Sequence, residues 1–341
     1  MALTRRKFLI QVPLAAALFS ACGARQTASQ TGRHYAELGS TAGAGRAERV
    51  LVCMPDNEHA RQVWTGLCDE LSADIQLIGV LVQRKQDSAS IHEAITRHRP
   101  SALVLINNPT VAAYREYQRA NRAASYPPAV IVMTSLLEQK GLGILNATGI
   151  RYEVPLITVV SNLRSLITHP VARVGVIRRA AFTGLVEFEA TLAKRENVSV
   201  VSQVVSPSPN PSEIKAALRR LKHQVDALWV LNDDHLLTRQ LLSEGWVAGL
   251  EEHPYIPTLV GARSLVTAGG SFGDFAVLPD HTALGTQAAG ILFDARDNGW
   301  AFENTEVQLP VSTTTVMDYL RANELFALRE DALSKVDVVL K

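Results

Sequence analysis

The sequence predicts an α/β fold built from two successive Rossmann-like lobes, each with a sheet of parallel strands. Short apolar runs alternate with stretches of helical periodicity, which is the order of strands and helices in a parallel sheet. The runs are apolar throughout rather than at every second position, as in strands that are buried on both faces. The alternation restarts after about residue 150, and a chain of 341 residues has the length for two cores of ordinary size.

The first lobe is expected to begin near Arg49. The segment 58–71 carries Val63, Leu67 and Leu71 on one stripe, which predicts an amphipathic helix between two strands. The expected strands of this lobe are 50–54, 75–82, 102–106, 129–133 and 144–150, and its other helices are one that ends near His98 and one over 111–123.

The second lobe repeats the alternation from Pro155 onward. Ser212 is a plausible N-cap for one of its helices, because a hydroxyl can accept a free backbone N–H there. The expected helices are 155–169, 183–195, 213–222, 235–248 and 282–297, and the expected strands are 174–177, 198–205, 227–231, 258–261 and 271–278. The stretch 307–320 is expected to be extended and to lead into a terminal helix.

Composition and motifs argue against several functional classes. The chain has a net charge of +1 and no basic stripe, so we expect no nucleic-acid partner. No G-x-G-x-x-G or Walker motif follows a strand, and no Cys/His cluster has metal spacing, so no cofactor or metal is expected. No G-x-S-x-G elbow is present, and neither His235 nor His281 has a nucleophile at a recognisable spacing. We therefore expect a protein that is not an enzyme.

The N-terminal segment predicts export. Arg5 and Arg6, followed by Phe8, match a twin-arginine signal, and the apolar stretch that follows is too short for a permanent membrane span. Cys22 follows two small residues, as in a lipobox, so residues 1–22 are expected to be a signal and Cys22 a lipidated first residue of the mature chain. An ordinary cleavage without lipidation is the alternative. Residues 23–47 are rich in Gly, Ala, Ser and Thr and predict a flexible tether.

Two further cysteines lie in the first lobe. Cys53 falls in an expected strand and Cys68 in the expected helix that follows it. Two buried free thiols are the favoured interpretation, and a disulfide remains the alternative in an oxidising compartment.

Several segments, in order, resemble a known family. Asn146-Ala147-Thr148-Gly149-Ile150 precedes the second lobe, and the later matches are 173–177, 225–234, 256–258, Gly269-Gly270 and the helix start 280–287. Together they are similar to the extracytoplasmic substrate-binding proteins of ABC importers, in the branch that includes tryptophan- and tyrosine-binding lipoproteins. The resemblance covers about residues 48–330.

The resemblance implies a type I periplasmic-binding-protein fold. Lobe 1 would be 48–150 plus 281–309 and lobe 2 would be 151–280 plus 310–330, with crossovers near 149–152, 278–281 and 309–311 and a C-terminal tail over 331–341. A monomer would close its lobes over a small ligand and present the closed form to an ABC permease. A membrane-bound sensor is the alternative partner.

Ligand residues are expected where parallel strands end, because ligands bind outside the carboxyl ends of open α/β sheets. The resemblance assigns a ligand ammonium to Asp233, with Asp234 as the competing position, and it places Asp280 at the hinge. Asn107-Asn108-Pro109 is bulkier and richer in amides than the family's usual segment, which leaves the ligand's identity open. The candidate residues are Asp56, Asn57, Asn107, Asn108, Thr134, Ser135, Arg178 with its neighbour Arg179, Asn232, Asp233, Arg263 and Asp280.

Overall fold

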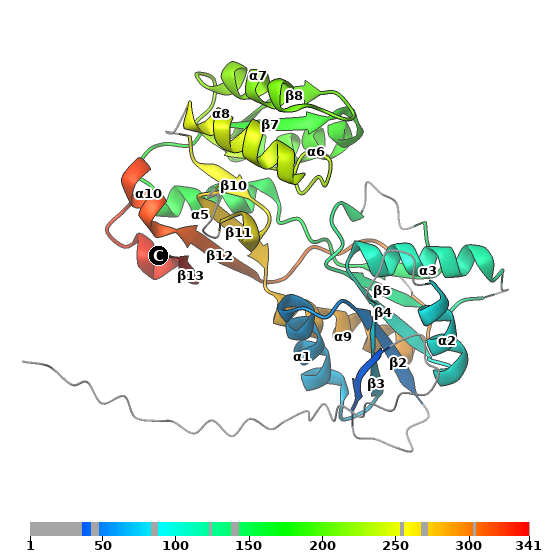
Figure 1. Ribbon diagram of the computed structural model, residues 1–341. Helices are drawn as coiled ribbons and strands as arrows, with labels where there is room; N and C mark the ends of the chain where they lie inside the picture. The colour runs from blue at the N-terminus through cyan, green and yellow to red at the C-terminus, as the bar shows by residue number, and fades with distance from the viewer. Residues whose placement is uncertain are drawn as a thin grey trace, which may run out of the picture.

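The computed structural model describes residues 36–41, 48–82, 88–122, 125–137, 143–252, 256–266, 272–302 and 305–340. Figure 1 shows two lobes, each with a sheet and its own helices, connected near the middle of the molecule. The signal over 1–22, with Cys22, lies outside the described residues. Within the part of the chain that the structure describes, no helix has the length and apolar character of a membrane span.

Lobe 1 contains a six-stranded sheet in the order β1-β3-β2-β4-β5-β6. All its pairings are parallel except that between β1 and β3. The strands are β1 (Ala36–Ser40), β2 (Arg49–Met54), β3 (Gln76–Leu81), β4 (Ala102–Ile106), β5 (Ala129–Val132) and β6 (Ala147–Gly149).

Helices cover both faces of this sheet. Residues of α1 (Glu58–Leu71) and α9 (His281–Asp297) share a buried apolar cluster on one face, whereas α2 (Ser88–His98) and α3 (Asn108–Ala120) belong to a cluster on the other. Burial on both faces explains why the strands are apolar throughout.

The helices α1 and α9 approach each other closely at two glycines. A Cβ on Gly66 would lie 2.1 Å from the carbonyl oxygen of Thr282, and one on Gly285 would lie 2.2 Å from that of Val63. Only glycine fits at this contact. It fixes α9, which follows the second lobe in sequence, onto the first.

Lobe 2 contains a seven-stranded sheet in the order β13-β12-β11-β10-β9-β7-β8. The pairing of β11 with β12 is antiparallel and the others are parallel. The strands are β7 (Arg173–Arg179), β8 (Ser199–Val205), β9 (Ala227–Trp229), β10 (Thr258–Val260), β11 (Phe275–Pro279), β12 (Thr313–Asp318) and β13 (Val338–Leu340).

The helices of lobe 2 also divide between the two faces of its sheet. One buried cluster includes α5 (Leu156–Leu166) and α6 (Thr183–Lys194), and the other includes α7 (Pro211–Leu221), the π-helix Leu241–Val247 and α8 (Ala248–Glu251). A further helix, α10 (Tyr319–Leu325), follows β12. The cap of α7 is Asn210, which accepts the N–H of Glu213 at 3.0 Å, so the expectation of Ser212 is wrong.

The helix expected over 235–248 begins later than the sequence indicated. The backbone oxygen of Asp233 accepts the N–H groups of Leu236 and Leu237, which closes a turn over the first part of the segment. The indole N–H of Trp246 then donates to the carbonyl of Leu236 at 2.9 Å and packs the later helix against this turn.

Both ends of the described chain contain strands where the sequence indicated a tether and a tail. β1 lies within 23–47 and pairs antiparallel with β3, with Leu38 buried in the lobe 1 core. β13 lies within 331–341 and extends the second sheet. Strand pairing at a sheet edge supplies backbone hydrogen bonds to segments whose side chains bury little, and such pairing leaves no hydrophobic pattern in the sequence.

The chain passes between the two sheets three times, as the predicted fold class requires, and hydrogen bonds connect the passages. The N–H of Arg151 in the first passage donates to the carbonyl of Gln308 in the third at 2.8 Å. The N–H of Asp280 in the second donates to the carbonyl of Ser312 in the third at 3.0 Å. We call the segments around these contacts the hinge.

Cys53 and Cys68 are buried free thiols, so the disulfide alternative is wrong. Burial raises the pKa of the Cys53 thiol to about 12, which keeps it protonated and unreactive.

Candidate functional site

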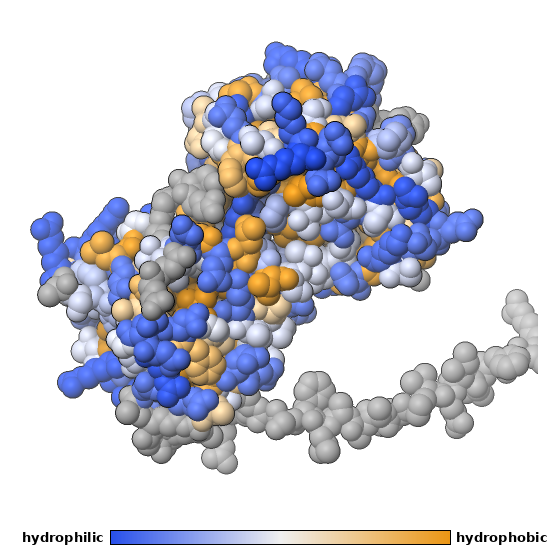
Figure 2. All heavy atoms as spheres, turned by 180° about the vertical axis from the view of Figure 1, so that it is seen from behind, coloured by the Kyte–Doolittle hydropathy of each residue, from blue (hydrophilic) through white to orange (hydrophobic). Residues whose placement is uncertain are grey.

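The candidate site lies at the carboxyl ends of the parallel strands of both lobes. In each lobe the strand order reverses beside the first parallel strand, between β2 and β4 in lobe 1 and between β7 and β9 in lobe 2. Ligands of open α/β sheets bind at such a reversal. Figure 2 shows the surface narrowing between the two lobes.

The loop after β2 uses its polar side chains locally. Asp56 forms an ion pair with Arg61, and both side chains are about half exposed. Asn57 caps α1 by accepting the N–H of Ala60 at 2.9 Å. A ligand that contacted either side chain would compete with these partners.

The segments that follow β4 and β5 contain buried polar atoms that have no hydrogen-bond partner among the residues that the structure describes. Asn107 caps α3, accepts the N–H of Thr110 at 3.1 Å and has a φ of 83°, in the left-handed region. The neighbouring Oδ1 of Asn108 is buried, as is Oγ1 of Thr134, and neither atom has a hydrogen-bond partner within the described part of the chain. Thr134 is 2% exposed, and Ser135 beside it is half-buried.

Such unpaired atoms are costly, because a buried polar group without a hydrogen bond loses about 1–3 kcal/mol of solvation. Asn108 and Thr134 follow two adjacent strands, β4 and β5, at the edge of the sheet where a ligand is expected. Thr134 is also flanked by Met133 and Leu136, whose φ values of 54° and 58° are unusual for such side chains.

In lobe 2 the strand reversal holds a buried ion pair. Nε of Arg179 lies 2.6 Å from Oδ2 of Asp233, and Nη2 lies 2.7 Å from Oδ1. This bidentate contact raises the pKa of Arg179 through its hydrogen bonds to Asp233. Of the two competing positions, Asp233 is buried and Asp234 is exposed. The carboxylate of Asp233 is already paired with Arg179.

The other candidates in lobe 2 are less central. Arg178 donates to the hydroxyl of Ser202 on β8 at 2.8 Å and to that of Thr183, at the start of α6, at 2.6 Å. Asn232 donates to the carbonyl of Gly261 at 3.2 Å. Arg263 is half-buried at the start of a short 3-10 helix, Arg263–Leu265, after β10.

Aromatic groups gather at the hinge, and none of them is among the residues that were expected to bind the ligand. The hydroxyl of Tyr152 lies 3.1 Å from Nε2 of His281, and the ring of His281 stacks on that of His59 with centroids 4.5 Å apart. Asp280 caps α9 by accepting the N–H of Ala283 at 3.0 Å. Burial lowers the pKa of His281 to about 4, with a further lowering from His59, and burial raises the pKa of Tyr152 to about 12.

Tyr152 and His281 both fall in expected crossovers, and this placement in the sequence could have predicted the cluster. A small cavity of about 30 Å³ lies beside it. This volume suits one water molecule. Its lining combines the hinge with the ends of β9 and β10, through Tyr152, Glu153, Trp229, Asn232 and Gly261.

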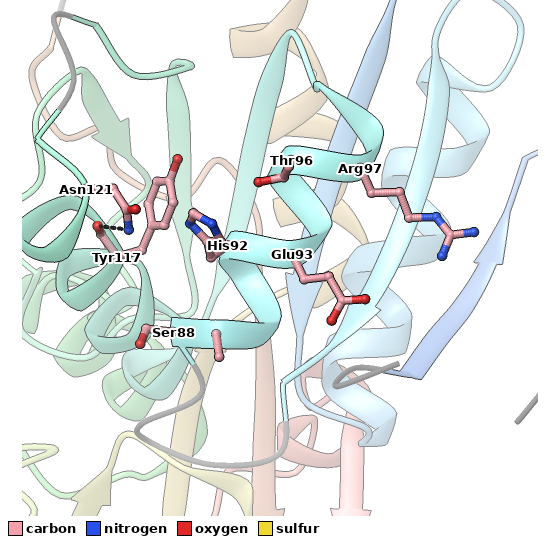
Figure 3. A pocket seen from close by; sticks show the side chains of 8 residues that line it. Ser88, His92, Glu93, Thr96, Arg97, Tyr117 and Asn121 are labelled. Carbon is pink, nitrogen blue, oxygen red and sulfur yellow. Dashed lines mark hydrogen bonds between the residues drawn. The ribbon is translucent and has the colours of Figure 1, made fainter. Parts of the chain in front are cut away.

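Two larger hollows lie away from the strand ends. A groove of about 680 Å³ runs between α2 and α3, and Figure 3 shows His92 pointing toward Tyr117 across it while Glu93 and Arg97 extend away from α3. A second groove, of about 600 Å³, includes Arg173 and Asp226 at the amino ends of the lobe 2 strands. Neither groove is lined by a residue that the sequence predicted to bind a ligand.

Among the described residues, no group of His, Cys, Asp and Glu has the arrangement of a metal site. The charged and polar groups at the strand ends can form hydrogen bonds and ion pairs with a small molecule.

Comparison with known proteins supports the fold. No protein-family model matches the chain, and no curated protein matches its sequence. A ligand-free, open substrate-binding protein with adhesive properties from Clostridium difficile is similar in structure, with a TM-score of 0.61 and 15% identity over 86% of this chain and 99% of that one.

Two other solved structures are also similar. A conserved domain protein from Vibrio cholerae has a TM-score of 0.55 and 17% identity, and an ABC domain in complex with L-Trp from Streptococcus pneumonia has a TM-score of 0.53 and 18% identity. Each covers 86% of this chain, which covers 100% of each. The chain has the two-lobed fold of the type I periplasmic-binding proteins, as the resemblance in its sequence implied.

Proposed function

We infer that this chain is an extracytoplasmic solute-binding protein of an ABC importer, and that it captures a small polar ligand by closing its lobes. It acts as a carrier rather than an enzyme. The observation that carries the proposal is that two buried atoms, Oδ1 of Asn108 after β4 and Oγ1 of Thr134 after β5, have no hydrogen-bond partner among the described residues. A polar ligand at this edge would supply the missing hydrogen bonds.

The hinge supports the same proposal. Three passages of the chain connect the lobes, and their mutual hydrogen bonds give a common axis about which the lobes can rotate. The ligand class favoured by the comparison is amino-acid-like, since one structurally similar protein was solved with L-Trp.

A thermal-shift screen of the purified full-length protein tests this function. The panel contains amino acids, other carboxylates, amines, sugars and nucleosides at millimolar concentration. A ligand at about 100 times its Kd stabilises the native state by about 2.7 kcal/mol, which gives a clear rise in Tm. A folded protein whose Tm is unchanged by every compound would contradict the proposal.

The proposal includes export through the twin-arginine route and a lipid anchor at Cys22. Fractionation of cells that express the full chain tests both parts. Replacing Arg5 and Arg6 with lysine should retain the protein in the cytoplasm, and Cys22→Ala should release an exported but unanchored form. Unchanged fractionation of both variants would contradict these assignments.

A further inference from the structure

The ion pair at the strand reversal of lobe 2 has an unequal exposure. The side chain of Arg179 is 15% exposed, whereas that of Asp233 is 2% exposed. The carboxylate therefore lies beneath the guanidinium, and the surface at the ends of β7 and β9 presents a cation.

The acceptor capacity of Asp233 is used within the protein. Oδ1 accepts hydrogen bonds from Nη2 of Arg179 and, at 3.1 Å, from the N–H of His235, while Oδ2 accepts from Nε of Arg179. A ligand ammonium could reach this carboxylate only by displacing Arg179. That displacement would break the bidentate ion pair between Arg179 and Asp233, which is a strong charge-assisted contact.

The guanidinium of Arg179 keeps donors that have no partner among the described residues. A guanidinium has five N–H groups, and those of Arg179 that have partners bond to Asp233 and, at 3.4 Å, to the carbonyl of Pro207. The ring of Phe182 lies 5.3 Å from its Cζ. Asp233 and Phe182 thus hold a planar cation in place, which is the arrangement that recognises a carboxylate with little loss of side-chain entropy.

Beyond Asp233, which is the counterion of Arg179, two nearby acids have partners of their own, and Asp234 acts on Arg179 through its charge. Asp56 is paired with Arg61 in the other lobe, and Asp280 accepts the N–H of Ala283 as a helix cap. Asp234 is exposed. The contacts of Arg178 are to hydroxyls, so it adds a second cation at the end of the same strand.

We propose that the ligand carries a carboxylate that binds Arg179, and that Asp233 positions this arginine rather than binding a ligand ammonium. The inference rests on the proposed solute-binding function and names the ligand class of that site. Asn108 and Thr134, at the strand ends of lobe 1, would contact neutral polar groups of the same ligand.

The experiment compares matched probes by thermal shift and calorimetry on the full-length protein. The probes are L-leucine, 4-methylpentanoate, which keeps the carboxylate alone, and 3-methylbutylamine, which keeps the amine alone, together with the same three forms of phenylalanine and alanine. Inorganic phosphate and sulfate distinguish a carboxylate site from a general anion site. We expect every binder to carry a carboxylate, and amines and the two inorganic anions not to bind.

Variants assign the contact to Arg179. Arg179→Gln should weaken the best carboxylate at least about 30-fold. The double variant Arg179→Gln/Asp233→Asn leaves no unpaired buried charge, so it should fold and show the same loss. Arg173→Gln is the matched control, since it removes an Arg–Asp pair at the opposite end of β7 and should leave the affinity unchanged.

The outcomes separate the two proposals. If an amine or a neutral compound binds, and the double variant binds it with the same affinity, the carboxylate inference is wrong. The solute-binding function would still stand. A carboxylate whose affinity is the same in the double variant would also overturn the carboxylate inference. The absence of any binder in the whole panel would contradict the solute-binding function itself.

Discussion

The hydroxyl oxygen of Tyr152 lies 3.1 Å from Nε2 of His281 and so joins the first passage between the lobes to the second. His281 begins α9 of lobe 1 and stacks on His59 of α1. Neutral imidazole suits this position, because burial and the adjacent His59 ring both oppose its protonation.

Removing the hydroxyl tests this contact. Tyr152→Phe should lower the free energy of unfolding by about 0.5–1.5 kcal/mol, the usual contribution of one hydrogen bond, and should change ligand affinity by loosening the hinge. Chemical denaturation and calorimetry measure the two effects. Tyr319→Phe is the control, because Tyr319 packs against the lobe 2 core and its hydroxyl has no hydrogen bond to the described residues. Equal losses in both variants would show that the contact contributes nothing.

The lowered pKa of His281 predicts a loss of stability in acid. The unfolded chain binds a proton on this imidazole below its usual pKa of 6.5, whereas the folded protein does so only below about 4. The free energy of unfolding should therefore fall as the pH decreases from about 6.5 to 4, by up to about 3 kcal/mol.

The comparison of wild type with His281→Asn isolates this effect, since the pKa of His98 is also lowered by burial. Denaturation curves between pH 4 and 7 should be flatter for the variant. Parallel curves would contradict the assignment to His281.

The contact between α1 and α9 predicts opposite effects for two glycine substitutions. Gly66→Ala places a methyl group against a backbone carbonyl and should destabilise the protein by about 1–3 kcal/mol or more. Gly290→Ala on α9 meets no atom within 4 Å and should stabilise it by about 0.4–1 kcal/mol. Thermal denaturation of both variants is the measurement, and a neutral Gly66→Ala would mean that the helices are not in this contact.

A buried ion pair fixes the start of lobe 2. Glu189 of α6 accepts hydrogen bonds from Arg151 and from the N–H of Leu156 at 2.8 Å, and its side chain is fully buried. Glu189→Ala would leave Arg151 buried and unpaired, so it should cost about 3–5 kcal/mol. Glu187→Ala on the exposed face of the same helix should change stability by about 0.5 kcal/mol or less. Urea denaturation distinguishes the two, and similar small effects would contradict the burial of this pair.

The strand and helix order was predictable because each buried strand is an apolar run and each helix shows its own periodicity. The range 58–71 matches α1, and Cys53 and Cys68 are buried thiols as expected. β1 and β13 were missed since edge strands form through backbone pairing, which composition does not reveal.

The polar site was less predictable, because sequence places a residue at a strand end without giving its partner. Asn108 and Thr134 were named as candidates, and each has a buried atom without a hydrogen-bond partner in the described ranges. Asp233 was also named, but its pairing with Arg179 joins residues 54 positions apart. No local pattern indicates which of two neighbouring arginines turns toward it.

The central claim is that a small ligand closes the two lobes, and an inter-lobe distance tests it most directly. Spin labels at Glu116→Cys on α3 and Glu187→Cys on α6, in a Cys22→Ser background with the buried cysteines retained, report this distance by pulsed electron paramagnetic resonance. The strongest stabilising compound of the thermal-shift panel should shorten the distance and narrow its distribution. An identical distribution with and without that compound would contradict hinge closure.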